Sequence, residues 1–368
     1  MNEPAPPRYD DASLAQVLPA ALAALTGSDN SFGLPQAEAV CLLLVDGLGL
    51  DALNEPEAAP LRELASVRDS IDAGFPATTA VSLATLGTGS PPGTHGIVGY
   101  AVALPDRSGL HQHLRWSQPV DPEAWQPVPT VFDRAVASGV AVTTVSKAQF
   151  AGSGLTRAAL RGGVFRGADQ PAARIAATVA ALDRGPALVY DYISDLDYAG
   201  HGFGPRSPAW RSALADVAAE VTELAGRLPT GAMLLVTGDH GMVNVSERDR
   251  VDLEAVPQLG QDVVLIGGEP RARHIYCADG RADAVAEVWA EVLGDRAWVR
   301  TKTQAITAGW FGPEVSHDAA QRIGDVVVAA RGNYALCLPR AEPNETNLAG
   351  MHGSLTAVEQ QVPLLLAT

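Results

Sequence analysis

Short runs of apolar residues recur along the chain, and each is followed within two residues by a glycine or an acidic residue. The clearest are Ala39–Val45, Ala187–Ile193 and Met233–Val236. Apolar runs of this length that lack regular polar alternation are typical of strands buried on both faces, as in parallel sheets. An amphipathic helical stretch, Pro208–Leu228, precedes the third run. The alternation predicts an α/β fold with a doubly wound, mostly parallel sheet flanked by helices.

The pattern changes after residue 250. The elements predicted there are three short strands and one helix, at 263–266, 274–277, 298–301 and 281–292. They indicate a small α+β lid over residues 251–320, inserted into a core formed by residues 1–250 and 321–368. The core pattern is predicted to resume with an apolar strand at 322–330. A lid of this kind is a candidate for substrate selection.

Two other stretches are predicted to be less regular. The helical segment Leu14–Leu25 contains Pro19, which is expected to kink or break it. The glycine-rich run Gly152–Gly167 matches no phosphate-binding loop spacing, and we expect a flexible loop there.

Composition narrows the classes of function. The formal net charge of −16 argues against binding of nucleic-acid polymers, which requires a basic face. A small phosphate ester remains compatible, because bound cations could meet its charge. No segment approaches the roughly 18 apolar residues of a membrane span, and the N-terminus lacks a secretory signal pattern. We therefore expect no membrane association and a cytoplasmic location.

The three cysteines, Cys41, Cys277 and Cys337, lie far apart in apolar contexts. This placement favours free buried thiols over a disulfide framework or a thiolate metal site.

Residues that can bind metals follow the first and third apolar runs. Asp46 comes directly after the first, and Asp239 and His240 follow the third after a Thr-Gly pair. The carboxyl ends of parallel strands share one edge of a sheet, where ligands bind in open α/β folds. Taken singly, each residue also has an ordinary explanation as a turn, capping or packing residue.

A second set follows the run Ala187–Ile193. Asp197 and His201 are four residues apart, so a helix or tight turn can direct both at one ion. Asp195 is an alternative ligand, but the spacing favours Asp197. His352 lies before the last strand and is followed by a glycine, as His201 is. The alternative is an acidic loop with surface histidines.

Six residues thus offer nitrogen or oxygen ligands, without thiolates: Asp46, Asp197, His201, Asp239, His240 and His352. Such ligands suit zinc or manganese, and six suffice for two ions. Two adjacent metals can clamp the attacking and leaving oxygens of a phosphoryl displacement.

Thr79 is the candidate nucleophile. Pro76 and the Thr78–Thr79 pair predict a helix start before a run of small and apolar residues. A hydroxyl at a helix N-terminus lies where backbone N–H groups and the macrodipole favour a phosphate or an alkoxide. The alternative is a plain N-cap threonine. His95 is expected to be a structural residue that holds a loop.

Together these motifs resemble the alkaline phosphatase superfamily, and most closely its nucleotide pyrophosphatase/phosphodiesterase branch. The matching segments are Val45–Gly47, Phe75–Thr79, Gly89–Gly96, Asp197–His201, Asp239–Gly241 and His352–Gly353. The resemblance implies an alkaline-phosphatase-like core and two bound metals. One would be held by Asp46, Asp239 and His240 and would contact Thr79, and the other would be held by Asp197, His201 and His352. Thr79 would attack phosphorus and form a phospho-threonine, which is then hydrolysed.

The chain departs from this branch in its expected substrate contacts. Phosphodiesterases of the branch usually carry an Asn after the nucleophile that binds a phosphate oxygen, and the nearest polar candidate here is Ser82. Tyr192 resembles an aromatic residue that stacks on a base, although tyrosine is also common in buried strands.

We therefore expect a two-metal phosphoester hydrolase that acts on a small phosphate ester, as a phosphodiesterase or nucleotide pyrophosphatase. The predicted cofactors are two zinc ions, with manganese as the alternative. A phosphomonoesterase or phosphonate hydrolase of the same superfamily is the alternative function. Further alternatives are a metal-dependent phosphomutase and a non-catalytic metal- or phosphate-binding protein.

Overall fold

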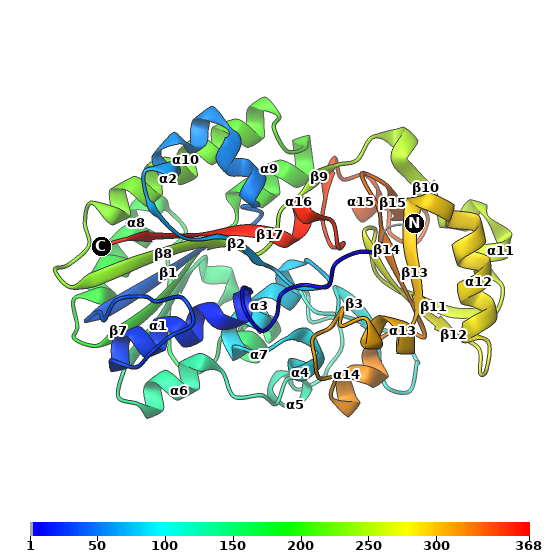
Figure 1. The fold of residues 1–368 in the computed structure, drawn as a ribbon, viewed down its shortest axis with the longest axis horizontal. Coiled ribbons are helices and arrows are strands. Elements are labelled where there is room, and N and C mark those ends of the chain that lie inside the picture. The colour runs from blue at the N-terminus through cyan, green and yellow to red at the C-terminus, as the bar shows by residue number, and fades with distance from the viewer. Residues whose placement is uncertain (1–2) are drawn as a thin grey trace.

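A seven-stranded sheet forms the centre of the computed structural model, which describes residues 3–368 (Figure 1). Its strands, in spatial order, are β2 (Ala65–Asp72), β17 (Gln361–Ala367), β8 (Ala232–Gly238), β1 (Ala39–Val45), β7 (Ala187–Ile193), β5 (Ala141–Ser146) and β6 (Val164–Gly167). The strands from β8 to β6 pair in parallel, whereas β17 is antiparallel to both β8 and β2. The predicted doubly wound, mostly parallel sheet is confirmed.

Helices cover both faces of this sheet. On one face lie α1 (Val17–Thr26), α3 (Thr79–Thr88), α6 (Val131–Ala137) and α7 (Gly154–Ala159), and on the other lie α2 (Ala59–Arg62), α8 (Pro171–Leu182) and α10 (Pro208–Ala225). Successive residues of β1 point alternately into two hydrophobic clusters: Leu42 and Leu44 pack with α1 and α3, and Cys41 and Leu43 pack with α8 and α10. Burial on both faces explains the continuous apolar run.

A smaller antiparallel sheet of four strands lies beside the core, at the right of Figure 1. Its strands, in spatial order, are β11 (Val263–Glu269), β12 (Ala272–Cys277), β14 (Val326–Ala330) and β13 (Ala297–Thr301), and α12 (Ala282–Leu293) packs against it. The strands and helix predicted between 251 and 320 are present. The strand predicted to resume the core at 322–330 is instead β14, which pairs with β12 and β13. Its residues are apolar and fully buried, a pattern that fits either sheet.

Two irregular stretches differ from expectation. Pro19 lies in the first turn of α1, where a backbone N–H has no intrahelical partner, and a short 3₁₀ turn at Leu14–Gln16 precedes it. The run Gly152–Gly167, predicted as a flexible loop, contains both α7 and the edge strand β6.

Two expectations from composition can be compared with the structure. All three cysteines are free and buried, as predicted. Among residues 3–368, no helix has both the length and the apolar character needed to cross a membrane.

The strand register brings the candidate ligands to one edge of the large sheet. The last residue of β1, Val45, lies opposite both Ile193, the last residue of β7, and Gly238, the last residue of β8. The segments that follow these three strands therefore meet. The segment after β1 carries Asp46, the segment after β7 is α9 (Asp195–Phe203), and the segment after β8 carries Asp239 and His240.

Candidate active site

Asp46, Asp239 and His240, called here the Asp46 group, converge at the ends of β1 and β8. Each offers one ligand atom, and the three atoms lie within 4.8 Å of one another. His240 Nε2 is 3.5 Å from Asp46 Oδ1 and 3.4 Å from Asp239 Oδ2. All three residues are buried. The predicted convergence of these residues is thus present.

Hydrogen bonds fix the orientation of the Asp46 group. The Gly47 N–H donates to Asp239 Oδ1 at 2.9 Å, and the Tyr192 hydroxyl donates to Asp46 Oδ2. His240 Nδ1 lies 3.1 Å from the carbonyl oxygen of Gly241. Because a carbonyl only accepts, this contact places the proton on Nδ1 and leaves Nε2 with a free lone pair.

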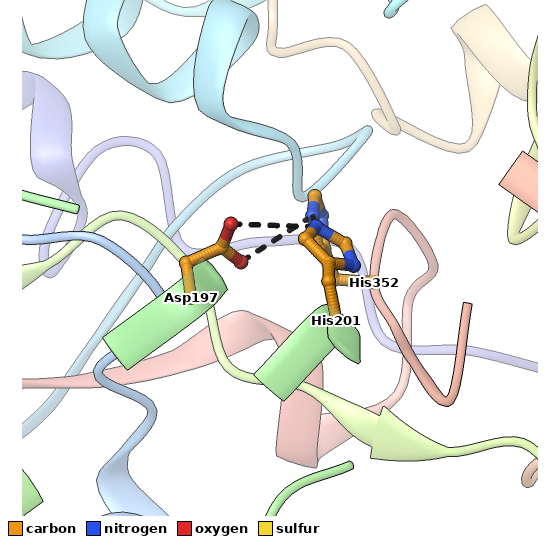
Figure 2. Close-up of side chains that lie close together, drawn as sticks. All are labelled: Asp197, His201 and His352. Carbon is orange, nitrogen blue, oxygen red and sulfur yellow. Dashed lines mark hydrogen bonds and ion pairs between the residues drawn. The ribbon is translucent and has the colours of Figure 1, made fainter. Parts of the chain in front are cut away.

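Asp197, His201 and His352, called here the Asp197 group, form a second cluster within 4.8 Å. Figure 2 shows Asp197 and His201 extending from α9 toward the ring of His352. Nε2 of His201 is 3.3 Å from Asp197 Oδ2, and Nε2 of His352 is 3.9 Å from Asp197 Oδ1. The two Nε2 atoms are 3.2 Å apart.

Both histidines of the Asp197 group are held by backbone carbonyls. His201 Nδ1 contacts the carbonyl of Gly350 at 2.8 Å, and His352 Nδ1 contacts that of Ala77 at 2.9 Å. Each ring therefore turns an unprotonated Nε2 toward Asp197. The ring of His352 also stacks on that of His240, with centroids 3.5 Å apart and planes at 14°, so the two groups are in direct contact.

The carboxylates meet the requirements of cation ligands. Asp46 Oδ1, Asp239 Oδ2 and Asp197 Oδ1 are buried and have no hydrogen-bond partner within residues 3–368. Buried carboxylate oxygens without a partner are costly unless a cation neutralises them. Each group contains at least one such oxygen beside an available imidazole nitrogen. This donor set fits two divalent ions, one in each group.

The pKa shifts point the same way. Burial, reinforced by neighbouring carboxylates, raises the pKa values of Asp46 and Asp197 well above the usual range. Burial lowers the pKa of His240 to about 4, and it lowers that of His352 well below its usual value with help from the other two histidines. These imidazoles are neutral at pH 7, as metal ligation requires, and a bound cation would stabilise the crowded carboxylates.

Thr79 lies beside the Asp46 group. It is the first residue of α3, it is 8% exposed, and its Oγ1 is 3.3 Å from His240 Nε2. The preceding residue, Thr78, has the extended backbone of an N-cap, but its hydroxyl donates to Glu269 Oε2 at 3.3 Å. Thr79 is therefore directed toward the ligand cluster at the positive end of a helix, as the nucleophile prediction requires.

The two candidate substrate contacts differ in their placement. Ser82 is buried, its hydroxyl donates to the carbonyl of Asp239 at 2.8 Å, and it is not among the residues that line the cavity. Tyr192 does line the cavity, and its ring packs edge-on against Phe150 while its hydroxyl holds Asp46.

Asp195 and His95, the two other candidate residues in the sequence, lie outside both groups. The side chain of Asp195 is 60% exposed and pairs with Lys147 at 3.3 Å. His95 is buried and uses both ring nitrogens, one 3.0 Å from Thr85 Oγ1 and one accepting from the Ile97 N–H at 3.1 Å, which fits the predicted structural role.

A cavity of about 550 Å³ opens beside Thr79 and is lined by members of both groups. Tyr100, Glu269 and Glu345 are among its lining residues and lie close enough to interact with one another, and they are called here the acidic wall. Sequence reasoning missed all three. Tyr100 follows the Gly89–Gly96 motif by four residues, which was an available signal. Glu269 and Glu345 stand in no motif, and only the fold brings them to the cavity.

Comparisons with known proteins identify the family and show related folds. The family described as type I phosphodiesterase / nucleotide pyrophosphatase matches residues 40–355. No curated protein matches the chain. Murine ectonucleotide pyrophosphatase / phosphodiesterase 5 has a similar structure, with a TM-score of 0.73 and 18% identity over 90% of this chain and 88% of that chain; an inactive form of it in complex with AMP matches equally well. Phosphonoacetate hydrolase from Sinorhizobium meliloti 1021, in complex with phosphonoacetate, has a TM-score of 0.67 and 20% identity over 90% of each chain.

Proposed function

The chain belongs to the type I phosphodiesterase / nucleotide pyrophosphatase family, and from this premise we propose that it is a two-metal phosphodiesterase in which Thr79 is the nucleophile. The observation that carries the assignment of residues is the pairing of two acid–histidine groups, each with an unpartnered buried carboxylate oxygen, beside a helix-terminal threonine.

The Asp46 group would hold the ion nearer to Thr79, and the Asp197 group would hold the other. Zinc is the proposed metal, with manganese as the alternative, because the ligands are nitrogen and oxygen atoms without thiolates. Bound there, two divalent ions would stabilise the charge that develops on the attacking and leaving oxygens of a phosphoryl displacement.

The residues of the chain then have separate tasks. Thr79 Oγ1 loses its proton and forms a bond to phosphorus while the bond from phosphorus to one ester oxygen breaks. That oxygen takes up a proton and leaves as an alcohol, and the phospho-threonine that remains still carries the second organic group of the diester. The free N–H groups of the first turn of α3 and its macrodipole favour the negative charge of the phosphoryl group. Attack by water on the phospho-threonine releases the phosphomonoester and restores Thr79. Tyr192 keeps Asp46 oriented through its hydroxyl.

The four-stranded unit contributes to the same cavity, since Glu269 and Pro270 lie at the end of β11. We propose that this unit, predicted as a lid, takes part in selecting the substrate. A small phosphate ester is the proposed substrate, and the AMP complex of the murine relative supports this class.

The proposal can be tested by metal analysis together with turnover. Protein purified with zinc or manganese should contain two ions per chain and hydrolyse bis(p-nitrophenyl) phosphate. Thr79→Ala should keep the metals and lose turnover by at least about a thousandfold, because the nucleophile is gone, whereas Thr79→Ser should retain part of it. Fewer than two ions per chain under saturating metal, or full activity of Thr79→Ala, would refute the proposal.

A monoesterase or a phosphonate hydrolase remains the second candidate, and the structural similarity to phosphonoacetate hydrolase is the observation in its favour. Relative rates on p-nitrophenyl phosphate and bis(p-nitrophenyl) phosphate distinguish the two. Faster hydrolysis of the monoester by the wild-type protein would favour the second candidate.

A further inference from the structure

We propose that the cavity beside Thr79 selects phosphodiesters whose organic group is apolar and carries no further negative charge, and that it excludes nucleoside polyphosphates and esters with a carboxylate. This inference rests on the proposed function, because it names the substrate class of the same site. The cavity has three features that support it.

The first feature is the apolar character of the lining. Leu83 of α3, Leu155 and Leu160 in and after α7, Phe150, and Phe165 of β6 all face the space next to Thr79. Tyr192 continues this surface, since its ring packs against Phe150 with centroids 6.0 Å apart. Apolar and aromatic surface of this kind gains free energy by burying an aryl or alkyl group, whereas a charged group would have to be desolvated without compensation.

The second feature is the absence of positive charge. Among residues 3–368, no lysine or arginine lines the cavity. Two cations directly next to lining residues in sequence are already paired: Lys147 contacts Ser194 and Asp195, and Arg271 contacts Glu359. Arg115, which follows the lining residue Leu114, is exposed and acts on Tyr100 from outside the lining. Recognition of an additional phosphate or carboxylate normally uses an Arg or Lys. Metal ions bound by the Asp46 group and the Asp197 group would already be engaged by the phosphoryl group under attack.

The third feature is the acidic wall. The Tyr100 hydroxyl donates to Glu345 Oε1 at 3.3 Å, so this phenol is already engaged by a carboxylate. Glu269 is buried, and its Oε1 has no partner within the described chain. In either protonation state a glutamate offers no positive charge. A second anionic group on the substrate would therefore meet carboxyl groups, and no lysine or arginine, among the lining residues that the structure describes on this side.

The experiment compares two diesters with the same p-nitrophenol leaving group: phenyl p-nitrophenyl phosphate and its 4-carboxyphenyl analogue, which adds one negative charge. With metal-loaded wild-type protein, we expect kcat/KM to be at least about tenfold lower for the carboxylate, and lower still for ATP. Glu345→Lys should reduce this ratio to about threefold or less, because it places a cation on the wall. Glu247→Lys, an equal change of net charge at an exposed residue outside the cavity, should leave the ratio unchanged.

Equal kcat/KM for the two diesters, or efficient cleavage of ATP by the wild-type protein, would overturn the inference while leaving the phosphodiesterase function intact. A ratio that stays at the wild-type value in Glu345→Lys would overturn the role of the wall. Absence of turnover with every ester, in protein shown to contain two metals, would overturn the proposed function itself.

Discussion

The ion pair between Arg271 and Glu359 joins the four-stranded unit to the core near the two ligand groups. We predict how much its removal lowers the free energy of unfolding. Both side chains are 0% exposed. Arg271 Nε donates to Glu359 Oε1 at 3.0 Å, and Nη2 donates to Oε2 at 2.6 Å. The same carboxylate accepts from the Ser354 N–H at 2.9 Å and from the Thr356 hydroxyl at 2.5 Å. The perturbation is Glu359→Gln, which keeps the shape and removes the charge.

The expected cost follows from burial. Leaving one member of a fully buried ion pair without its partner typically costs about 3–5 kcal/mol, because the remaining charge is desolvated and uncompensated. Glutamine retains one acceptor oxygen, so we expect the lower end, about 3 kcal/mol of the free energy of unfolding. Arg273 and Glu342 provide a matched control: that pair is 2.8 Å apart, but the Glu342 side chain is 21% exposed. Glu342→Gln should cost about 1 kcal/mol.

The change should also weaken metal binding. The carbonyl of Glu359 accepts from the Gly241 N–H at 2.9 Å, next to His240, and its carboxylate holds Ser354, two residues after His352. Outer contacts that orient metal ligands typically contribute about tenfold or more to metal affinity. We therefore expect Glu359→Gln to lower zinc affinity by about tenfold, and Glu342→Gln to leave it nearly unchanged.

The assay is urea unfolding of chelator-treated protein, followed by fluorescence, together with calorimetric zinc titration of the same variants. A loss of less than 1 kcal/mol in Glu359→Gln, or a loss equal to that of Glu342→Gln, would refute the reasoning that burial sets the strength of this pair.

Three further predictions concern other parts of the site and fold. Burial raises the pKa of Asp239 to about 6, so in metal-free protein its contribution to stability is fully present below about pH 4 and is lost as the pH rises through 6. The urea midpoint of chelated protein should therefore fall between about pH 4 and pH 6.5, and saturating metal should remove that fall. Gly241→Ala should lower both metal content and stability, by about 2 kcal/mol for the latter, because a Cβ there would lie 1.9 Å from the Val358 carbonyl oxygen. His111→Phe should raise the free energy of unfolding, measured in urea, by about 1 kcal/mol. The reason is that the ring is 0% exposed and neither of its nitrogens has a hydrogen-bond partner in the described chain. A lower free energy of unfolding in this variant would contradict the prediction.

The convergence of the candidate metal ligands was predictable because their signals in the sequence are local. Asp46 and Asp239 each follow an apolar run, and the edge of a parallel sheet where such runs end is fixed by general topology. Asp197 and His201 are one helical turn apart on α9, which the four-residue spacing indicates directly. The division of the six candidate ligands into the Asp46 group and the Asp197 group followed from the family resemblance, and the strand order agrees with it.

Other features depend on contacts between distant segments and could not be read in the same way. The apolar run of β14 would fit the large sheet as well as the small one, and only its pairing with β12 and β13 decides its place. Ser82 has the right position in sequence for a substrate contact, but one turn into α3 its hydroxyl faces Asp239. Glu269 reaches the cavity because β11 ends there, a fact that no local pattern contains.

The stacked rings of His240 and His352 belong to different ligand groups, and this contact has a consequence for how the protein acquires its metals. An ion that fixes one ring limits the orientations open to the ring stacked on it. Binding of an ion to one group therefore reduces the conformational freedom that the other group must lose when it binds its own ion. The two positions should then fill cooperatively, and by linkage the loss of either ion should lower the affinity of the protein for the other ion. Under metal limitation, a population of this protein would divide into doubly loaded and empty molecules, with few that hold a single ion.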